Sequence, residues 1–70
     1  MELRGHFVQP SMPIGEVFAV SRDMRTFVAR VGIRTEDDSV IEVDAHSFNT
    51  EPGDNVWIDI KGRARKWIKP

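Results

Sequence analysis

The C-terminal stretch EPGDNVWIDIKGRARKWIKP carries the residue types best suited to bind a ligand. A strand that alternates from Val56 would turn Trp57 away from the core, and the basic run GRARK follows it. An exposed tryptophan beside arginines on a barrel face is a common arrangement for stacking nucleic-acid bases. Arg63 and Arg65 would then contact phosphates with a salt-sensitive affinity. One interpretation of the pattern is therefore a surface for an anionic partner.

Two other interpretations of the same residues remain open. Trp57 would equally pack under the N-terminal arm or against Trp67, or lie in a self-association interface, where aromatic side chains are enriched. The basic run would equally protect an edge strand against pairing with another chain. The full set of candidate partner-binding or nucleic-acid-binding residues is Arg25, Arg30, Trp57, Lys61, Arg63, Arg65, Lys66 and Trp67.

Catalytic chemistry finds little support in the residue types. His6 and His46 are the only histidines, and the chain has no cysteine. His46 with Asp44 and Ser47 has the composition of a base and its orienting group, but no nucleophile is placed with them. No histidine and carboxylate spacing matches a metal site. We therefore expect no catalytic residue, no metal and no cofactor.

Size and composition indicate one small soluble domain, residues 1–70. Hydrophobic residues make up 40% of the chain and charged residues 30%, and no apolar run is long enough for a membrane span. The absence of cysteine fits a reducing cytoplasm. A chain this short buries roughly 60% of its unfolded surface, which leaves little room for a deep enzyme pocket. A protein partner or a dimer would add burial.

The net charge of −1 hides an uneven distribution. Residues 22–34 and 61–69 are basic, and they flank an acidic block at 36–59 that contains no lysine or arginine. The blocks either pair with each other in the fold or leave a basic block exposed to an anionic partner.

Alternation of apolar and polar residues predicts an all-β chain. Residues 1–13, with two prolines, form an extended lead-in in which LRGHFV is a short edge strand. Strands follow at 15–20, 26–34 and 39–45, with a turn at 21–25 and Phe27 among the core-facing residues of the second strand. Residues 46–50 form at most one helical turn.

The segments 26–34 and 39–45 predict a hairpin with a definite register. If Asp37 is the centre of the loop, Ile33 faces Ile41 and Val31 faces Val43 on the inner side. On the outer side, the same register places Arg30 opposite Asp44. A slip of one residue would set apolar side chains against charges, so the register is strongly specified.

The C-terminal part predicts a turn and two further strands. EPGD fits a type II turn, with a glycine where φ is positive. In the strand NVWIDIK that follows, Ile60 would face the core with Val56 and Ile58, while Trp57 and Asp59 would face out. RKWI forms a last short strand. Five or six short strands in 70 residues predict a small barrel, OB-like or SH3-like.

The run from Gly15 to Ile68 resembles the TOBE domain, a small OB-like barrel found at the C-terminal end of ATPase subunits of some bacterial and archaeal importers. The matching features are GEVFAVSRD, TFVARVGIR, SVIEVDAHSF, EPGDNVWIDI and KGRARKWI. The resemblance implies a non-catalytic accessory or regulatory module that acts through protein contacts. The alternative is a nucleic-acid-binding barrel that uses a surface of tryptophan and arginine.

Overall fold

The structure, a computed structural model, describes residues 8–70. Within this part the chain is all-β and has no helix. Its strands are β1 (Gly15–Asp23), β2 (Val28–Thr35), β3 (Val40–Asp44), β4 (Asn55–Ile58) and β5 (Ala64–Lys66). The prediction of a small all-β domain with five or six short strands is confirmed, and the described part has five. The edge strand predicted in LRGHFV falls on residues outside the described part, apart from Val8.

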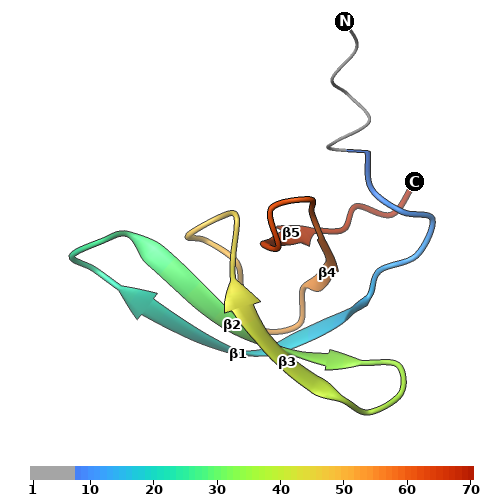
Figure 1. Cartoon of the computed structure of the whole chain (residues 1–70), viewed down its shortest axis with the longest axis horizontal. Coiled ribbons are helices and arrows are strands. Elements are labelled where there is room, and N and C mark those ends of the chain that lie inside the picture. The colour runs from blue at the N-terminus through green and yellow to red at the C-terminus, as the bar shows by residue number, and fades with distance from the viewer. Residues whose placement is uncertain (1–7) are drawn as a thin grey trace, which may run out of the picture.

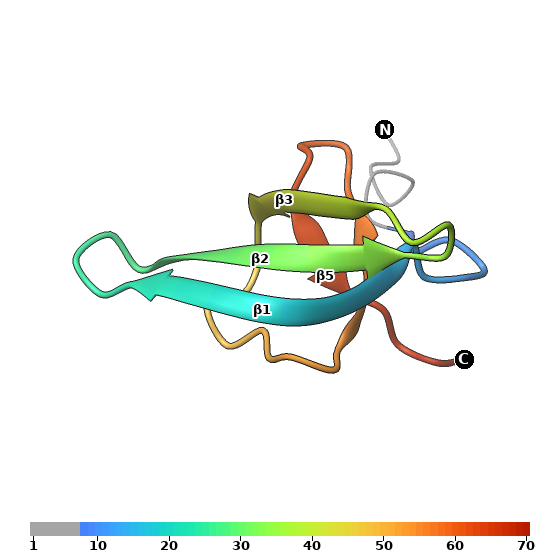
Figure 2. The ribbon, with the colours of Figure 1, turned by 90° about the horizontal axis from the view of Figure 1, so that it is seen from below.

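The five strands form one antiparallel sheet in the order β3-β2-β1-β4-β5. Its two outer strands approach each other, because Ala45 directly after β3 forms a parallel bridge to Ala64 of β5. The amide of His46 donates to the carbonyl oxygen of Ala64 at 2.8 Å. The sheet is therefore curled into a small barrel, from which the β1–β2 hairpin runs out to one side (Figures 1 and 2).

The predicted register of the β2–β3 hairpin is confirmed. Val31 pairs with Val43, Ile33 with Ile41, and Arg30 with Asp44. The turn between these strands contains Asp38 in the left-handed region, with φ of 67°. The alternation of both segments specifies this pairing, because it is the register that buries both apolar sets on the same face.

The core is a single cluster of small and β-branched side chains. Its buried members are Val17, Ala29, Val31, Ile33, Ala45, Val56 and Ala64. Two predicted core residues are wrong: Phe27 and Ile60 are each 68% exposed. Both residues lie just outside a strand, because β2 begins at Val28 and β4 ends at Ile58. The alternation of apolar and polar residues extends beyond the ends of both strands, so it does not mark where they stop.

Gly15 lies where β1 passes close to β2. A Cβ atom at this position would overlap the carbonyl oxygen of Arg34 and lie 2.8 Å from Cγ2 of Ile33. Neither neighbour can move easily, because one is backbone and the other is a buried core side chain. We expect Gly15→Ala to lower the free energy of unfolding by about 1–3 kcal/mol, the usual cost of overpacking. Urea denaturation measures this, and an unchanged midpoint would contradict the close approach.

The long loop between β3 and β4 is fastened to the β1–β2 hairpin. Nε of Arg22 donates to the carbonyl of Phe48 at 2.8 Å, and its Nη2 donates to the carbonyl of Thr50 at 2.7 Å. The same guanidinium lies 3.3 Å from Glu51. The PGD turn then follows, with Gly53 at φ of 97° as its sequence predicts. Arg22 thus fixes the loop against the hairpin.

Candidate functional site

Of the three interpretations of Trp57, the structure contradicts the exposed stacking platform. Trp57 lies outside the core cluster, yet only 8% of it is exposed. A hollow of about 320 Å³ next to it is lined by residues of the loop after β3, of β5 and of both terminal segments, including Gln9 and Ile68. The side chain of Gln9 receives a hydrogen bond from the amide of Ile68 and donates one to its carbonyl. The terminal segments thus lie beside Trp57, as in the arm-packing interpretation.

Arg63 and Arg65 are engaged by Asp59, which the sequence wrongly places on the exposed face. Asp59 is buried, and its Oδ1 accepts hydrogen bonds from the amides of Lys61 and Arg63 at 2.9 and 3.0 Å. Its Oδ2 accepts one from Nε of Arg65 at 2.7 Å and lies 3.8 Å from Nε of Arg63. The turn between β4 and β5 is therefore built around one carboxylate.

The charge state of Asp59 follows from these hydrogen bonds and ion pairs. Burial opposes its ionisation and is the largest single influence on its pKa. The hydrogen bonds from Arg65 and from the amides of Arg63 and Lys61, with the nearby Arg63 charge, together outweigh burial. The pKa of Asp59 is therefore below its usual value, and the carboxylate is charged at neutral pH.

Of the other predicted site residues, Lys66 lines the hollow beside Trp57 together with Arg65, whereas Arg30 lies apart from them. Arg30 pairs with Asp44 at 2.9 Å on the outer face of the sheet. Lys66 lies 3.8 Å from a carboxylate oxygen of Asp54. The indole nitrogen of Trp67 donates to the carbonyl of Pro10 at 2.9 Å and fastens the N-terminal segment.

Arg25 and Lys61 differ from these residues. Their side chains make no hydrogen bond or ion pair with any other residue in the described range 8–70. Within this range they are the cations, among the eight sequence candidates, that remain exposed and unpaired.

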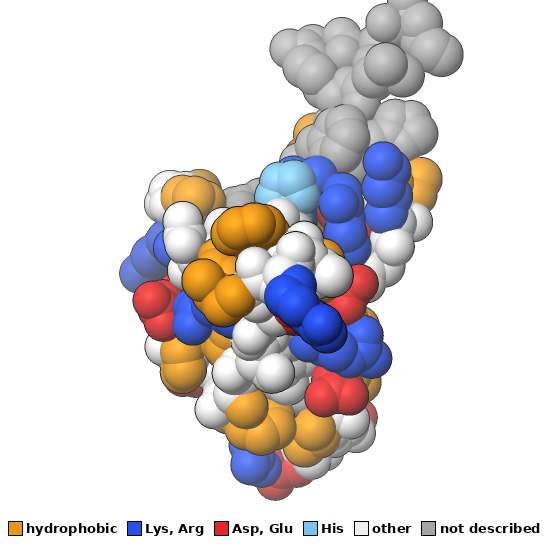
Figure 3. All heavy atoms as spheres, turned by 90° about the vertical axis from the view of Figure 1, so that its left-hand side faces the viewer, with side chains coloured by type: hydrophobic (Ala, Val, Ile, Leu, Met, Phe, Trp, Pro, Cys, Tyr) orange, Lys and Arg blue, Asp and Glu red, His pale blue; other side chains and the backbone are white. Residues whose placement is uncertain are grey.

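The tip of the β1–β2 hairpin presents apolar side chains that the sequence does not single out. Met24 and Phe27 are 66% and 68% exposed, and Val28 is also exposed. The turn is nevertheless well defined, because the amide of Phe27 donates to the carbonyl of Asp23 at 2.8 Å. Figure 3 looks onto this end of the molecule, where apolar side chains lie among lysine and arginine side chains.

Phe27 occupies its position at a double cost. Its φ is 57°, in the left-handed region that glycine and asparagine adopt most readily. A bulky residue there costs about 1–2 kcal/mol. Its ring is also left mostly in water, with one edge-to-face contact to Phe48 at 5.8 Å between ring centroids. Neither the backbone angle nor the exposure of this position favours a phenylalanine.

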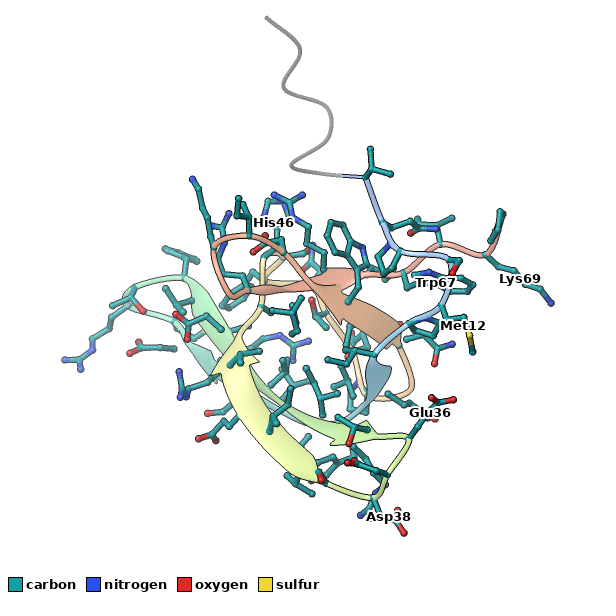
Figure 4. The ribbon with its side chains drawn as sticks, turned by 45° about the vertical axis from the view of Figure 1, so that its right-hand side comes forward. Met12, Glu36, Asp38, His46, Trp67 and Lys69 are labelled. Atoms are coloured by element: carbon teal, nitrogen blue, oxygen red, sulfur yellow. The ribbon has the colours of Figure 1, made fainter. Side chains whose placement is uncertain are left out.

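Residues 8–70 show neither a cluster of metal-ligating side chains nor a long apolar helix. Among residues 8–70 no three histidine, cysteine, aspartate or glutamate side chains are grouped closely enough to hold a metal ion. The same residues contain no helical segment with the length and apolarity that a membrane crossing requires. His46 is exposed and lies at the rim of the barrel, beside the start of the long loop (Figure 4).

Comparison with known proteins adds no further assignment. No protein-family model, curated protein or solved structure matches the chain. The resemblance to the TOBE domain therefore stays a prediction. Function has to be argued from the surface features described above.

Proposed function

We propose that this chain is a non-catalytic binding barrel that acts through protein contacts, with the tip of the β1–β2 hairpin as the contact surface. The observation that carries the proposal is Phe27, an aromatic side chain exposed in a left-handed backbone conformation. A residue that costs stability in two ways and persists in an ordered turn is best explained by a contact made outside the chain.

The composition of the tip supports a protein partner. Met24, Phe27 and the unpaired Arg25 lie within one four-residue turn. Methionine, phenylalanine and arginine are enriched in protein interfaces, and exposed aromatic anchors carry much of the binding energy there. Arg22 and Phe48 support the tip from below, since the Arg22 guanidinium lies 5.8 Å from the Phe48 ring centroid. A preorganised tip loses little entropy on binding.

The order of the strands is compatible with an OB-like barrel and hence with a TOBE-like accessory module. With the bridge between Ala45 and Ala64, the neighbours run β1-β2-β3-β5-β4 and back to β1. A five-stranded Greek-key barrel of the OB type has its binding surface on strands 2 and 3 and on the loops that follow strands 1 and 4. The hairpin tip is the first of these loops in the present chain.

One observation favours nucleic acid as the second candidate partner. The unpaired Arg25 and Lys61 lie on the turns after β1 and β4, the two loops that OB barrels use for oligonucleotides. The other residues that would carry this function are engaged elsewhere, because Trp57 is buried and Arg63 and Arg65 hold Asp59. A protein partner is therefore the better supported proposal.

Phe27→Asn tests the proposal. Asparagine tolerates the left-handed conformation, and the relief of strain offsets the lost ring contact, so the free energy of unfolding should stay within about 1 kcal/mol of wild type. Proteins retained from a cell extract by the immobilised wild-type chain and by the variant are compared by quantitative mass spectrometry. A partner is a protein that the wild type retains and Phe27→Asn loses.

Val40→Asn is the matched control, since Val40 is also exposed but lies at the start of β3, away from the tip. It should retain the same partner. Equal retention by the wild type and Phe27→Asn would contradict the proposal. Single-stranded DNA titrated in parallel tests the second candidate, and salt-sensitive binding lost on Arg25→Glu with Lys61→Glu would favour it instead.

A further inference from the structure

The end of the barrel opposite the hairpin tip carries two adjoining hollows. The first, of about 410 Å³, is lined by Met12, Pro13, Gly15, Glu16, Phe18, Arg34, Thr35, Glu36 and Asn55. The second, of about 440 Å³, shares Thr35 and Glu36 with it and continues to Ile14 and Ile41. Figure 4 shows Met12 and Glu36 on the same side of the molecule, near the start of β1. The two hollows form one groove along the end of β2.

The floor of the first hollow is an aromatic ring displayed by the strand geometry. The register between β1 and β2 shifts at Phe18, which leaves this residue without a direct partner. Its ring lies over Gly32, where a Cβ atom would come within 3.0 Å of it, and Phe18 is 47% exposed. A bulge and a glycine in a strand together allow a side chain to lie flat on the sheet. The groove thus has an apolar floor.

Two carboxylates on this groove lack partners. The side chains of Glu16 and Glu36 make no ion pair and accept no hydrogen bond from any other residue in the described range. Every other side-chain carboxylate of residues 8–70 has such a partner, and these are Asp23, Asp37, Asp38, Glu42, Asp44, Glu51, Asp54 and Asp59. The unpaired acids therefore coincide with the apolar hollow.

The one cation among residues 8–70 that lines the groove does not neutralise these acids. The Arg34 guanidinium lies 5.6 Å from the centroid of the Phe18 ring and 3.7 Å from a carboxylate oxygen of Asp38. It is thus stacked on the ring and paired with another residue. The groove is left with an apolar centre between negative charges, the complement of a basic segment with an apolar side chain.

We propose that this groove docks an extended basic segment of a partner protein. An apolar side chain of that segment lies between Met12, Pro13 and Phe18, and its lysine or arginine side chains pair with Glu16 and Glu36. Burial of the apolar side chain supplies affinity, and the charges supply orientation and association rate. The groove and the hairpin tip face opposite ways, so this docking does not depend on the function proposed for the tip.

Fluorescence anisotropy with three capped, labelled peptides of equal length tests the proposal. One alternates lysine and leucine, one lysine and serine, and one glutamate and leucine. We expect the lysine and leucine peptide to bind at least about tenfold more tightly than either of the others, since each lacks one of the two complementary features. The double variant Glu16→Lys with Glu36→Lys should bind the lysine and leucine peptide about tenfold or more weakly than the wild type does.

Glu42→Lys with Glu51→Lys is the matched control, because it makes the same change in net charge on exposed residues outside the groove. It should weaken binding much less, and circular dichroism checks that both double variants fold. Equal weakening by the two double variants would reduce the effect to net charge and overturn the proposal. If the lysine and serine peptide binds as tightly as the lysine and leucine peptide, the proposal is also overturned, because no apolar side chain then binds in the hollow.

Two-dimensional NMR of the labelled protein locates the peptide independently. Shifts are expected at residues 12–18 and 34–41, and shifts confined to the hairpin tip or the C-terminal segment would overturn the proposal. Sedimentation of the free protein tests the other occupant. Self-association that disappears in Glu16→Lys with Glu36→Lys would identify a second copy of the chain as the occupant and replace the partner segment proposed here.

Discussion

Val31→Asp is expected to abolish folding. Val31 is fully buried at the middle of β2, opposite Val43 and within the core cluster. An aspartate there would bury an unpaired charge or remain neutral at a raised pKa, and either costs several kcal/mol. A domain of 70 residues has a stability of only about a few kcal/mol. The substitution therefore exceeds what the fold can tolerate.

Circular dichroism and one-dimensional NMR measure this outcome directly. The variant should lack dispersed amide resonances and a cooperative thermal transition. Ser21→Asp is the matched control, because Ser21 is exposed and pairs with Arg30 across the β1–β2 ladder. It should melt like the wild type, since a surface carboxylate beside an arginine changes stability little. A cooperative melt of Val31→Asp near that of the wild type would show that the core is elsewhere.

The β2–β3 hairpin could be predicted because all of its determinants are local in the sequence. Two alternating segments lie on either side of a short polar loop, and only one register sets Val31 against Val43 and Arg30 against Asp44. The turn at Gly53 was predictable for the same reason, since proline and glycine specify backbone angles without any tertiary contact.

The candidate site could be predicted less well, because it depends on contacts between distant residues. The alternation predicts which face of the strand carries Trp57, but it does not predict that segments from both ends of the chain lie beside that side chain. The hydrogen bond between Trp67 and Pro10 joins residues 57 positions apart, and no spacing in the sequence encodes it. The environment of Trp57 is therefore a tertiary property.

The strand ends explain the remaining errors. Periodicity extends through Phe27 and Ile60 although the strands stop at Val28 and Ile58, so a core residue and a loop residue have the same pattern. The turn at Phe27 contains no glycine or asparagine to mark it. Its functional interest comes from its backbone angle and exposure, neither of which a sequence displays.

Asp59→Ala is expected to have the second largest effect among these substitutions. Removal of this carboxylate would take away an acceptor from two amides and from the Arg65 guanidinium. Breaking one partner of a buried ion pair costs about 3–5 kcal/mol, because the remaining charge stays poorly solvated. The side chains of Arg63 and Arg65 are partly exposed, so we expect a cost of about 3 kcal/mol at neutral pH.

Acid should reproduce part of this loss in the wild type. The pKa of Asp59 is lowered in the folded state, so its contribution is fully present above the unfolded-state value of about 3.9. That contribution is lost as the pH falls through the lower folded-state pKa, where the carboxyl becomes protonated. The difference in stability between the wild type and Asp59→Ala should therefore be constant near neutral pH and shrink below about pH 4.

Urea denaturation of both proteins between about pH 2 and 7 measures this difference, with the range chosen to span the pKa of aspartate. Asp37→Asn is the matched control, because the pKa of Asp37 is also lowered, first by the hydrogen bond from Thr35 and then by those from Ser39. Asp37 is exposed in the β2–β3 turn and holds no arginine, so its substitution should change stability far less. A wild-type stability that exceeds that of Asp59→Ala equally at acid and neutral pH would show that the side chain acts through packing. If the difference instead shrinks in acid, the charge of Asp59 holds Arg63 and Arg65 in place, and the spacing of the basic residues alone does not.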